Sequence, residues 1–169
     1  MMLKLVLSLL VMSTGFLTNL NLSSSEKQGL PTEAEQKILL EKHNEWRRTV
    51  GVPPLEWSEE LAKSALKWAK NLKRGCRFEH SDSGYGENLW KGTTGAYALS
   101  VVVDSWGNEV EYYNYETNEC DPGQICGHYT QVVWGSTKKV GCASIECDGF
   151  TTWVCQYDPP GNWIGQKPY

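Results

Sequence analysis

Six cysteines constrain this chain of 169 residues more than any other feature. All six follow an N-terminal segment in which Lys4 precedes an apolar run, residues 5–12, and a small polar tract at residues 23–25 comes shortly after. This layout is typical of a secretory signal peptide, which we place at residues 1–25. An even number of cysteines behind such a peptide indicates three disulfides made in an oxidising compartment, so we expect a secreted, extracellular protein.

The remaining residues, 26–169, have a length typical of one domain with one hydrophobic core. The N-terminal apolar run is too short to span a bilayer, and no other stretch is long enough, so we expect no transmembrane segment. Without Lys4, 15 basic residues stand against 20 acidic ones, a net charge near −5, and there is no basic run. This balance argues against nucleic-acid binding, and we expect a monomer.

Residues 138–157 have the pattern of two antiparallel strands joined by a tight turn at Asp148-Gly149, a strong hairpin signal. A two-residue turn at this point fixes the register of the whole hairpin. In that register Cys142 faces Cys155, and we expect the two residues to form a disulfide.

The other four cysteines are assigned from their positions. Cys147 points to the opposite face of the sheet from Cys142, because side chains alternate along a strand. Cys120 and Cys126 flank a short turn and are natural partners, which leaves Cys147 to pair with Cys76. This is one connectivity among the fifteen that six cysteines allow.

A helix is predicted over residues 32–50. Thr32 and Glu35 can form a capping box at its start, and Gly51, followed by two prolines, ends it. The predicted buried stripe of this helix consists of Ile38, Leu39, Trp46 and Val50.

A second helix is predicted to begin after Ser58 and to end before Gly75, with acidic residues in its first turn and basic residues near its end. A third is predicted at residues 96–106, although its three consecutive valines would also suit a strand. Propensity alone leaves residues 129–134 ambiguous. Helices followed by an antiparallel hairpin indicate an α+β or layered α-β-α fold.

Three histidines and two acids are the candidates for chemistry. They form no local catalytic motif: there is no H-E-x-x-H or G-x-S-x-G segment, and three disulfides leave no free cysteine. By spacing alone each would be read as a structural or surface residue. The candidates are His43, His80, Glu87, Glu109 and His128.

Longer motifs change this interpretation. The segments GHYTQVVWGSTKKVGCA, from residue 127, and WVCQYDPPGNWIGQKPY, from residue 153, closely resemble the two signatures of the CAP superfamily. This superfamily groups cysteine-rich secretory proteins, antigen 5 and the plant pathogenesis-related class-one proteins. The likeness extends to HNEWR at 43–47, EHSDSGYGENLW at 79–90 and YNYETNEC at 113–120, so it covers nearly all of the chain beyond the signal peptide.

The resemblance implies an α-β-α sandwich with a small antiparallel sheet between helices. It also implies the disulfide pairing given above and a helix at residues 129–134. Because the chain stops at GQKPY with no further cysteine-rich module, it looks most similar to the plant-type members.

The family places two histidines and two glutamates together in a central cleft, and these fall on His80, Glu87, Glu109 and His128. His43 belongs to the first helix motif and is interpreted as structural, bonded within the core. Two imidazoles and two carboxylates suit a divalent metal, zinc best of all, which we do not expect folding to require. Without metal, the same groups could share protons or bind water.

For function, the resemblance favours a non-enzymatic defence or signalling protein that binds a sterol or another lipid, with microbial or cell-surface components as further partners. In plant-type members the lipid groove is distinct from the His/Glu cleft and involves the segment matching residues 106–120. Here that segment carries the candidate lipid-binding residues Trp106, Tyr112, Tyr113 and Tyr115, for which core packing is the alternative.

A second hypothesis is a metal-dependent extracellular hydrolase or protease that uses the four His/Glu residues, although no residue is assigned a catalytic role. The resemblance also raises the release of a C-terminal signalling peptide, Pro159–Tyr169. The alternative is a tail packed over the sheet by Trp163.

Overall fold

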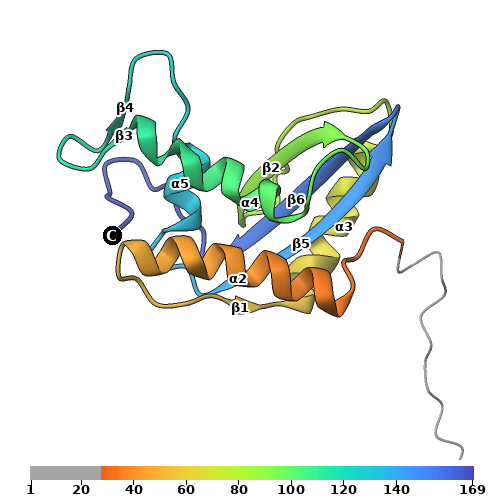
Figure 1. Cartoon of the computed structure of the whole chain (residues 1–169), viewed down its shortest axis with the longest axis horizontal. Helices are drawn as coiled ribbons and strands as arrows, with labels where there is room; N and C mark the ends of the chain where they lie inside the picture. The colour runs from red at the N-terminus through yellow and green to blue at the C-terminus, as the bar shows by residue number, and fades with distance from the viewer. Residues whose placement is uncertain (1–27) are drawn as a thin grey trace, which may run out of the picture.

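A four-stranded sheet organises the computed structural model, which describes residues 28–169 (Figure 1). The predicted signal peptide at residues 1–25 lies outside the described residues. The strand order is β1-β5-β6-β2, and a short ribbon of β3 and β4 stands apart from this sheet. In chain order the elements are α2 (Glu33–Thr49), β1 (Glu56–Trp57), α3 (Glu59–Leu72), β2 (Gly86–Thr93), α4 (Ser100–Gly107), the 3-10 helix η1 (Asn108–Tyr112), β3 (Tyr113–Asn114), β4 (Glu119–Cys120), α5 (Gly127–Val132), β5 (Lys139–Cys147) and β6 (Phe150–Asp158).

The hairpin of β5 and β6 has the predicted register. Cys142 faces Cys155 across the two strands, and their sulfurs are bonded. The other two predicted disulfides are also present, Cys76–Cys147 and Cys120–Cys126. The hairpin register, the alternation of side chains along β5 and the short turn between Cys120 and Cys126 together predict the disulfide framework correctly.

Two hydrophobic clusters lie on opposite faces of the sheet, where the sequence predicted one core. On one face α2, α4 and α5 pack around Val140 and Tyr157, and on the other α3 packs against Ala143 and Val154. Figure 1 shows α2 and α3 on the two sides of the β5–β6 hairpin. The core is divided because both faces of the sheet are covered, and the predicted α-β-α sandwich is confirmed.

Helix α2 begins with the predicted capping box between Thr32 and Glu35. Its buried stripe differs from the prediction, because Ile38 is 42% exposed while His43 and Arg47 are fully buried. The helix turns a polar side toward the core, and these polar groups have partners inside the protein. Periodicity of apolar residues alone does not reveal such a face.

Arg47 is the largest of these buried side chains. Its guanidinium donates to the carbonyl oxygens of Pro53, Val132, Trp134 and Thr137, at distances of 2.7 to 3.0 Å. Burial lowers the pKa of Arg47 to about 10, which leaves it charged at neutral pH. The arginine thus satisfies carbonyls at the end of α5 that no helical partner reaches.

Helix α4 begins at Ser100, four residues later than predicted. Residue 96 belongs instead to the turn that leaves β2, in which Gly95 has a φ of +74° and the Ala96 amide donates to Thr93 O at 3.1 Å. The valine run is helical, not extended, because it packs inside the core beside Trp106. Of the ambiguous residues 129–134, residues 129–132 lie in α5, as the resemblance implied, and Val133 and Trp134 follow the end of the helix.

The C-terminal tail is not held by Trp163, which is 55% exposed. It is fixed instead by Asn162, whose side chain contacts Gly127 and Thr130 of α5, and by Tyr169, which stacks on Tyr115. The prediction that the tail packs over the sheet through Trp163 is therefore wrong, because the anchors are polar contacts to α5 and the terminal ring. Release of this segment as a peptide stays a prediction.

None of the helices within residues 28–169 is both long enough and apolar enough to cross a membrane.

Candidate functional site

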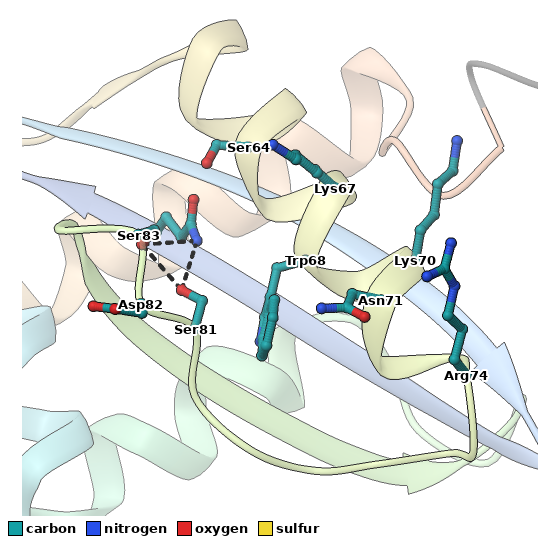
Figure 2. A pocket seen from close by; sticks show the side chains of 10 residues that line it. Ser64, Lys67, Trp68, Lys70, Asn71, Arg74, Ser81, Asp82 and Ser83 are labelled. Atoms are coloured by element: carbon teal, nitrogen blue, oxygen red, sulfur yellow. Dashed lines mark hydrogen bonds between the residues drawn. The ribbon is translucent and has the colours of Figure 1, made fainter.

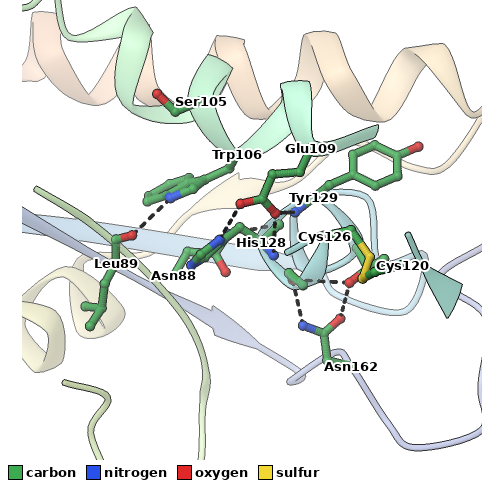
Figure 3. A network of polar contacts seen from close by, with 12 residues as sticks. Asn88, Leu89, Ser105, Trp106, Glu109, Cys120, Cys126, His128, Tyr129 and Asn162 are labelled. Carbon is green, nitrogen blue, oxygen red and sulfur yellow. Dashed lines mark hydrogen bonds and ion pairs between the residues drawn. A yellow bond between two sulfur atoms is a disulfide. The ribbon is translucent and has the colours of Figure 1, made fainter. Parts of the chain in front are cut away.

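The Glu109 carboxylate holds the start of α5 (Figure 3). Its Oε2 accepts hydrogen bonds from the backbone amides of His128 and Tyr129, at 3.0 and 3.1 Å, and its Oε1 lies 2.6 Å from His128 Nδ1. Cys126, the residue at the helix start, makes no side-chain cap of its own. A carboxylate from η1 therefore caps α5 and orients the imidazole in one set of contacts.

Three further contacts fix the position of His128. Its carbonyl oxygen accepts from Asn88 Nδ2 at 3.0 Å, which ties α5 to β2. Its ring stacks on Trp106, with 6.3 Å between ring centres, and the Trp106 indole donates to Leu89 O at 3.1 Å. The Cys120–Cys126 disulfide closes the loop that leads into α5. His128 is thus held by its ring, its backbone and the loop before it.

His80 and Glu87 form a second pair, with 2.9 Å between His80 Nδ1 and Glu87 Oε1. The Glu87 side chain is only 4% exposed and also accepts from the amide and hydroxyl of Ser81 and from Gln156 Nε2, whereas the His80 side chain is 59% exposed. The hydrogen bond to Glu87 raises the pKa of His80. Burial alone would raise the pKa of Glu87, but its hydrogen bonds outweigh burial and lower it.

The four predicted metal ligands are therefore joined as two pairs. Alternation along β2 sends Glu87 to the α3 face of the sheet, beside Gln156, while Asn88 turns toward Tyr157 and His128 on the other face. Within residues 28–169 the structure gathers no group of three or more His, Cys, Asp or Glu side chains that could hold a metal. The four-residue metal site stays a prediction.

The hydrogen bonds of each pair still define what it offers to a metal. Both carboxylates accept from protein donors on both oxygens, and each is bonded to the Nδ1 of its histidine. Among the described residues, no group is bonded to the Nε2 of His80 or of His128. A carboxylate on Nδ1 with an open Nε2 is the arrangement of many metal-binding histidines, so the residues fit zinc through their imidazoles.

A buried chain of hydrogen bonds connects α2 to His128. His43 Nδ1 donates to Leu39 O at 2.7 Å, and its Nε2 accepts from the Tyr157 hydroxyl at 2.9 Å. Asn88 Nδ2 reaches both the Tyr157 hydroxyl, at 3.2 Å, and His128 O. Burial lowers the pKa of His43 to about 4 and keeps the ring neutral, which confirms its predicted role as a bonded core residue.

The predicted lipid-binding aromatics do not form one stripe. Trp106 is buried in the core, whereas Tyr113 and Tyr115 lie in and beside the β3–β4 ribbon, near the end of the chain. The Tyr115 ring stacks on Tyr169 with 4.7 Å between ring centres, and Tyr112 is half-buried. Tyr115 is 36% exposed, so packing does not account for the whole of its ring, and the lipid-binding role of the three tyrosines stays a prediction.

A different cavity, of about 480 Å³, opens beside Trp106. Its walls combine aromatic and aliphatic side chains with the His128–Glu109 pair, so this apolar cavity adjoins one of the His/Glu pairs where the sequence predicted a separate groove. The residues that line it are Phe78, Leu89, Trp90, Lys91, Ser105, Trp106, Glu109, His128 and Phe150.

Sequence comparison identifies a protein family and relatives that agree with this fold. The family model described as CAP, the cysteine-rich secretory protein family, covers residues 40–157. The chain belongs to the CAP family. This CAP protein is 42% identical over 145 residues to "Pathogenesis-related protein PR-1" of Medicago truncatula, across 85% of this chain and 84% of that protein. It is 45% identical over 141 residues to "Pathogenesis-related protein 1" of Arabidopsis thaliana, across 83% and 86%.

A solved structure shares the fold of this CAP protein. The crystal structure of NaASP2 with Zn2+ superposes with a TM-score of 0.68 at 28% identity, over 83% of this chain and 87% of that chain. The predicted likeness to the CAP superfamily and to its plant pathogenesis-related members is therefore confirmed.

Several residues that build the site escaped the sequence reasoning. Asn88, Gln156 and Ser81 position the two pairs, and although each lies inside one of the family motifs, its neutral polar side chain suggested no role by itself. One signal was present: Gln156 follows Cys155, so it points to the opposite face of the sheet from that disulfide. To predict that Glu87 is its partner, the register of β2 against β6 would have to be known, and no tight turn connects these two strands to fix it.

Proposed function

We propose that this CAP protein is a secreted, non-enzymatic defence protein that binds a sterol or another apolar lipid. Two relatives with this domain over most of their length are named pathogenesis-related proteins. Three disulfides, among them one that closes a span of 71 residues, suit an oxidising extracellular environment. The further partners that we propose are microbial or cell-surface components that present such a lipid.

The observation that carries the ligand class is the aromatic cavity of about 480 Å³. Trp90, Trp106 and Phe150 offer flat apolar surfaces, which suit a rigid ring system more than a flexible polar ligand. Lys91 and the His128–Glu109 pair also line the cavity and supply polar partners for a single hydroxyl group. An apolar body with one polar end is the chemistry of a sterol.

Among the described residues, the same cavity offers no free side-chain nucleophile for covalent catalysis. Ser105 is the only hydroxyl residue that lines it, and its Oγ donates to Val101 O at 2.6 Å within α4. All six cysteines are in disulfides. His128 is bonded to Glu109 and not to a nucleophile, so the geometry favours binding over covalent catalysis.

Binding of labelled ergosterol to the purified protein without its signal peptide tests this proposal. We expect saturable binding, weakened at least about tenfold in a Phe78→Ser/Phe150→Ser variant, because both exposed rings line the cavity. Ile125→Ser is the matched control, since Ile125 is a similarly exposed apolar residue that does not line it. Absence of saturable binding, or equal losses in both variants, would refute the assignment.

We also propose that His80 and His128 bind zinc through their Nε2 atoms, each ring oriented by its glutamate. The solved relative named as holding Zn2+ supports the choice of metal. A bound zinc ion would supply Lewis acidity at this surface. Glu87 and Glu109 hold the imidazoles in the tautomer that presents Nε2.

Calorimetric titration with zinc tests the ligands. His80→Gln and His128→Gln should each weaken binding at least about tenfold, whereas Glu146→Gln, an exposed acid on β5, should not change it. Removal of zinc with a chelator should leave the disulfide-bonded protein folded, because the fold needs no metal, and should lower its unfolding midpoint only by the amount that loss of a bound ligand causes. Zinc binding that survives both histidine substitutions would exclude these ligands.

A further inference from the structure

A second and larger pocket, of about 750 Å³, lies on the other face of the sheet, between α3 and the loop at residues 81–83 (Figure 2). It shares no lining residue with the aromatic cavity. Hydroxyl, amide and basic side chains dominate its walls. The lining residues are Ser64, Lys67, Trp68, Lys70, Asn71, Arg74, Ser81, Asp82, Ser83 and Gln156.

Trp68 gives this pocket one flat apolar wall. Figure 2 shows the ring projecting from α3 into the space between the helix and the loop at 81–83. Its indole nitrogen donates to Glu79 O at 3.0 Å, which fixes the orientation of the ring. Trp68 is half-buried, and it is the one large apolar side chain among the residues that line the pocket. A ligand therefore meets a rigid aromatic surface on one side only.

Gln156 supplies an acceptor that the protein leaves without a partner. Its side chain is fully buried, and its Nε2 donates to Ser81 Oγ, Ser83 Oγ and Glu87 Oε2 at 3.0 to 3.3 Å. The carboxylate fixes which end of the amide faces it, because only the nitrogen can donate. Its Oε1 is the one buried side-chain oxygen or nitrogen within residues 28–169 that has no hydrogen-bond partner. A buried acceptor without a donor calls for an explanation, and a water or a ligand hydroxyl or amide that enters between α3 and the loop at 81–83 would supply one.

Positive charge gathers along the helix wall of this pocket, although the whole chain has a net charge of −4. Lys67, Lys70 and Arg74 line it from α3 and the turn after that helix, and Asp82 is the only acidic residue among its lining. The span from Lys67 to Arg74 covers two helical turns, about 10 Å. These cations therefore match negative charges spaced along an extended chain more closely than one compact phosphate.

We propose that this pocket binds an acidic oligosaccharide built of uronic acid residues. One face of a pyranose ring carries C–H groups that can pack on Trp68, while its hydroxyls can pair with the serine, asparagine and glutamine side chains of the wall. Carboxylates on successive sugars can pair with the spaced cations of α3. A lipid tail is disfavoured because Trp68 is the only large apolar surface, so this site is separate from the sterol cavity.

Titration with de-esterified hexagalacturonate, followed by Trp fluorescence and by the side-chain amide resonance of Gln156, tests the proposal. We expect saturable binding that shifts the Gln156 resonance and weakens as salt is added. The variant Lys67→Ala/Arg74→Ala should bind about tenfold more weakly. Lys138→Ala/Lys139→Ala is the control, since it removes the same charge from exposed residues outside the pocket.

Trp68→Phe provides a second variant that keeps an aromatic ring in α3 while reducing the stacking surface, and it should also weaken binding. A neutral cellohexaose and the methyl-esterified galacturonate should bind more weakly than the acid. The proposal would be overturned if hexagalacturonate showed no saturable binding, or if acidic and neutral sugars bound equally well. It would also be overturned if Lys67→Ala/Arg74→Ala and the control Lys138→Ala/Lys139→Ala lost equal affinity. Preferential binding of a nucleotide or of phosphoinositide vesicles at this pocket would overturn the sugar assignment. None of these outcomes bears on ergosterol binding, which concerns the other cavity.

Discussion

The two histidine–glutamate pairs share one contact, carboxylate to Nδ1, but are anchored differently. Glu87 is held mostly by side chains, with one backbone amide, that of Ser81, and it leaves the His80 ring largely exposed. Glu109 is held by two backbone amides at the start of α5, and the half-buried His128 ring stacks on Trp106. The first pair therefore joins an exposed ring to a loop and the sheet, whereas the second is part of the framework that starts a helix.

Loss of the Glu109 carboxylate should be the costliest change to either pair. Glu109→Ala leaves two amides of α5 and the His128 ring without their acceptor, and we expect the free energy of unfolding to fall by about 3 kcal/mol. Urea unfolding followed by circular dichroism measures this. Glu111→Ala, an exposed acid on the same 3-10 helix, is the control and should change stability by less than about 0.5 kcal/mol. Equal effects would mean that the cap contributes nothing.

The third histidine, His43, has no carboxylate partner, and we expect it to make the protein less stable in acid. Its pKa is about 4 in the folded protein and near 6.5 when unfolded, so the unfolded chain binds more protons between these values. The free energy of unfolding is therefore not reduced by His43 above pH 6.5, where the ring is neutral in both states. It falls by about 3 kcal/mol as the pH drops to 4, because the unfolded chain takes up the proton first.

Urea unfolding at several pH values measures this loss, and His43→Gln should flatten that part of the profile. NMR titration of the wild-type ring provides an independent reading, because the buried ring should stay neutral until the pH approaches 4. A His43 ring that titrates near pH 6.5 in the folded protein would contradict this account.

The smallest effect is expected at the exposed pair. Glu87→Gln should lower the raised pKa of His80 toward its ordinary value and cost about 1 kcal/mol of stability, since the amide retains part of the hydrogen bonding. The pKa of His80 is higher in the folded protein than in the unfolded chain. The stability that protonated His80 contributes is therefore complete below its pKa in the unfolded chain and is lost as the pH rises through its pKa in the folded protein. NMR titration of His80 measures the shift.

His80→Ala should change stability by less than about 0.5 kcal/mol at pH 7, because the ring is mostly exposed. A cost as large as that of Glu109→Ala would erase the distinction between the pairs.

Features set by neighbouring residues were predictable from the sequence. The capping box at Thr32 depends on a residue three positions away, and the bond between Cys142 and Cys155 depends on the turn between them. The motifs of the family supplied the helix at 129–134 and named the residues of both pairs. The α-β-α architecture was thus predictable from two sources: interactions between residues close in the sequence, and the long motifs of the family.

What the sequence could not reveal depends on contacts between distant segments. Ile38 was predicted inside because its spacing fits the stripe, but the core accepts Arg47 in that helix since carbonyls from other segments surround it. The separation of Glu87 from His128 across β2 required the pairing of β2 with β6. The aromatic cavity likewise joins Phe78 and Phe150, which no local pattern relates.

Arg47 has a consequence for how the protein opens. The Arg47 guanidinium donates to carbonyl oxygens in three places: after α2, at the end of α5, and in the segment that leads into β5. If any of these segments unfolds locally, the same buried charge loses hydrogen-bond acceptors. We therefore expect the free energy of local opening there to approach that of complete unfolding. In hydrogen exchange, α2, α5 and the chain between α5 and β5 should therefore behave as one cooperative unit, with protection factors that fall together as denaturant is added.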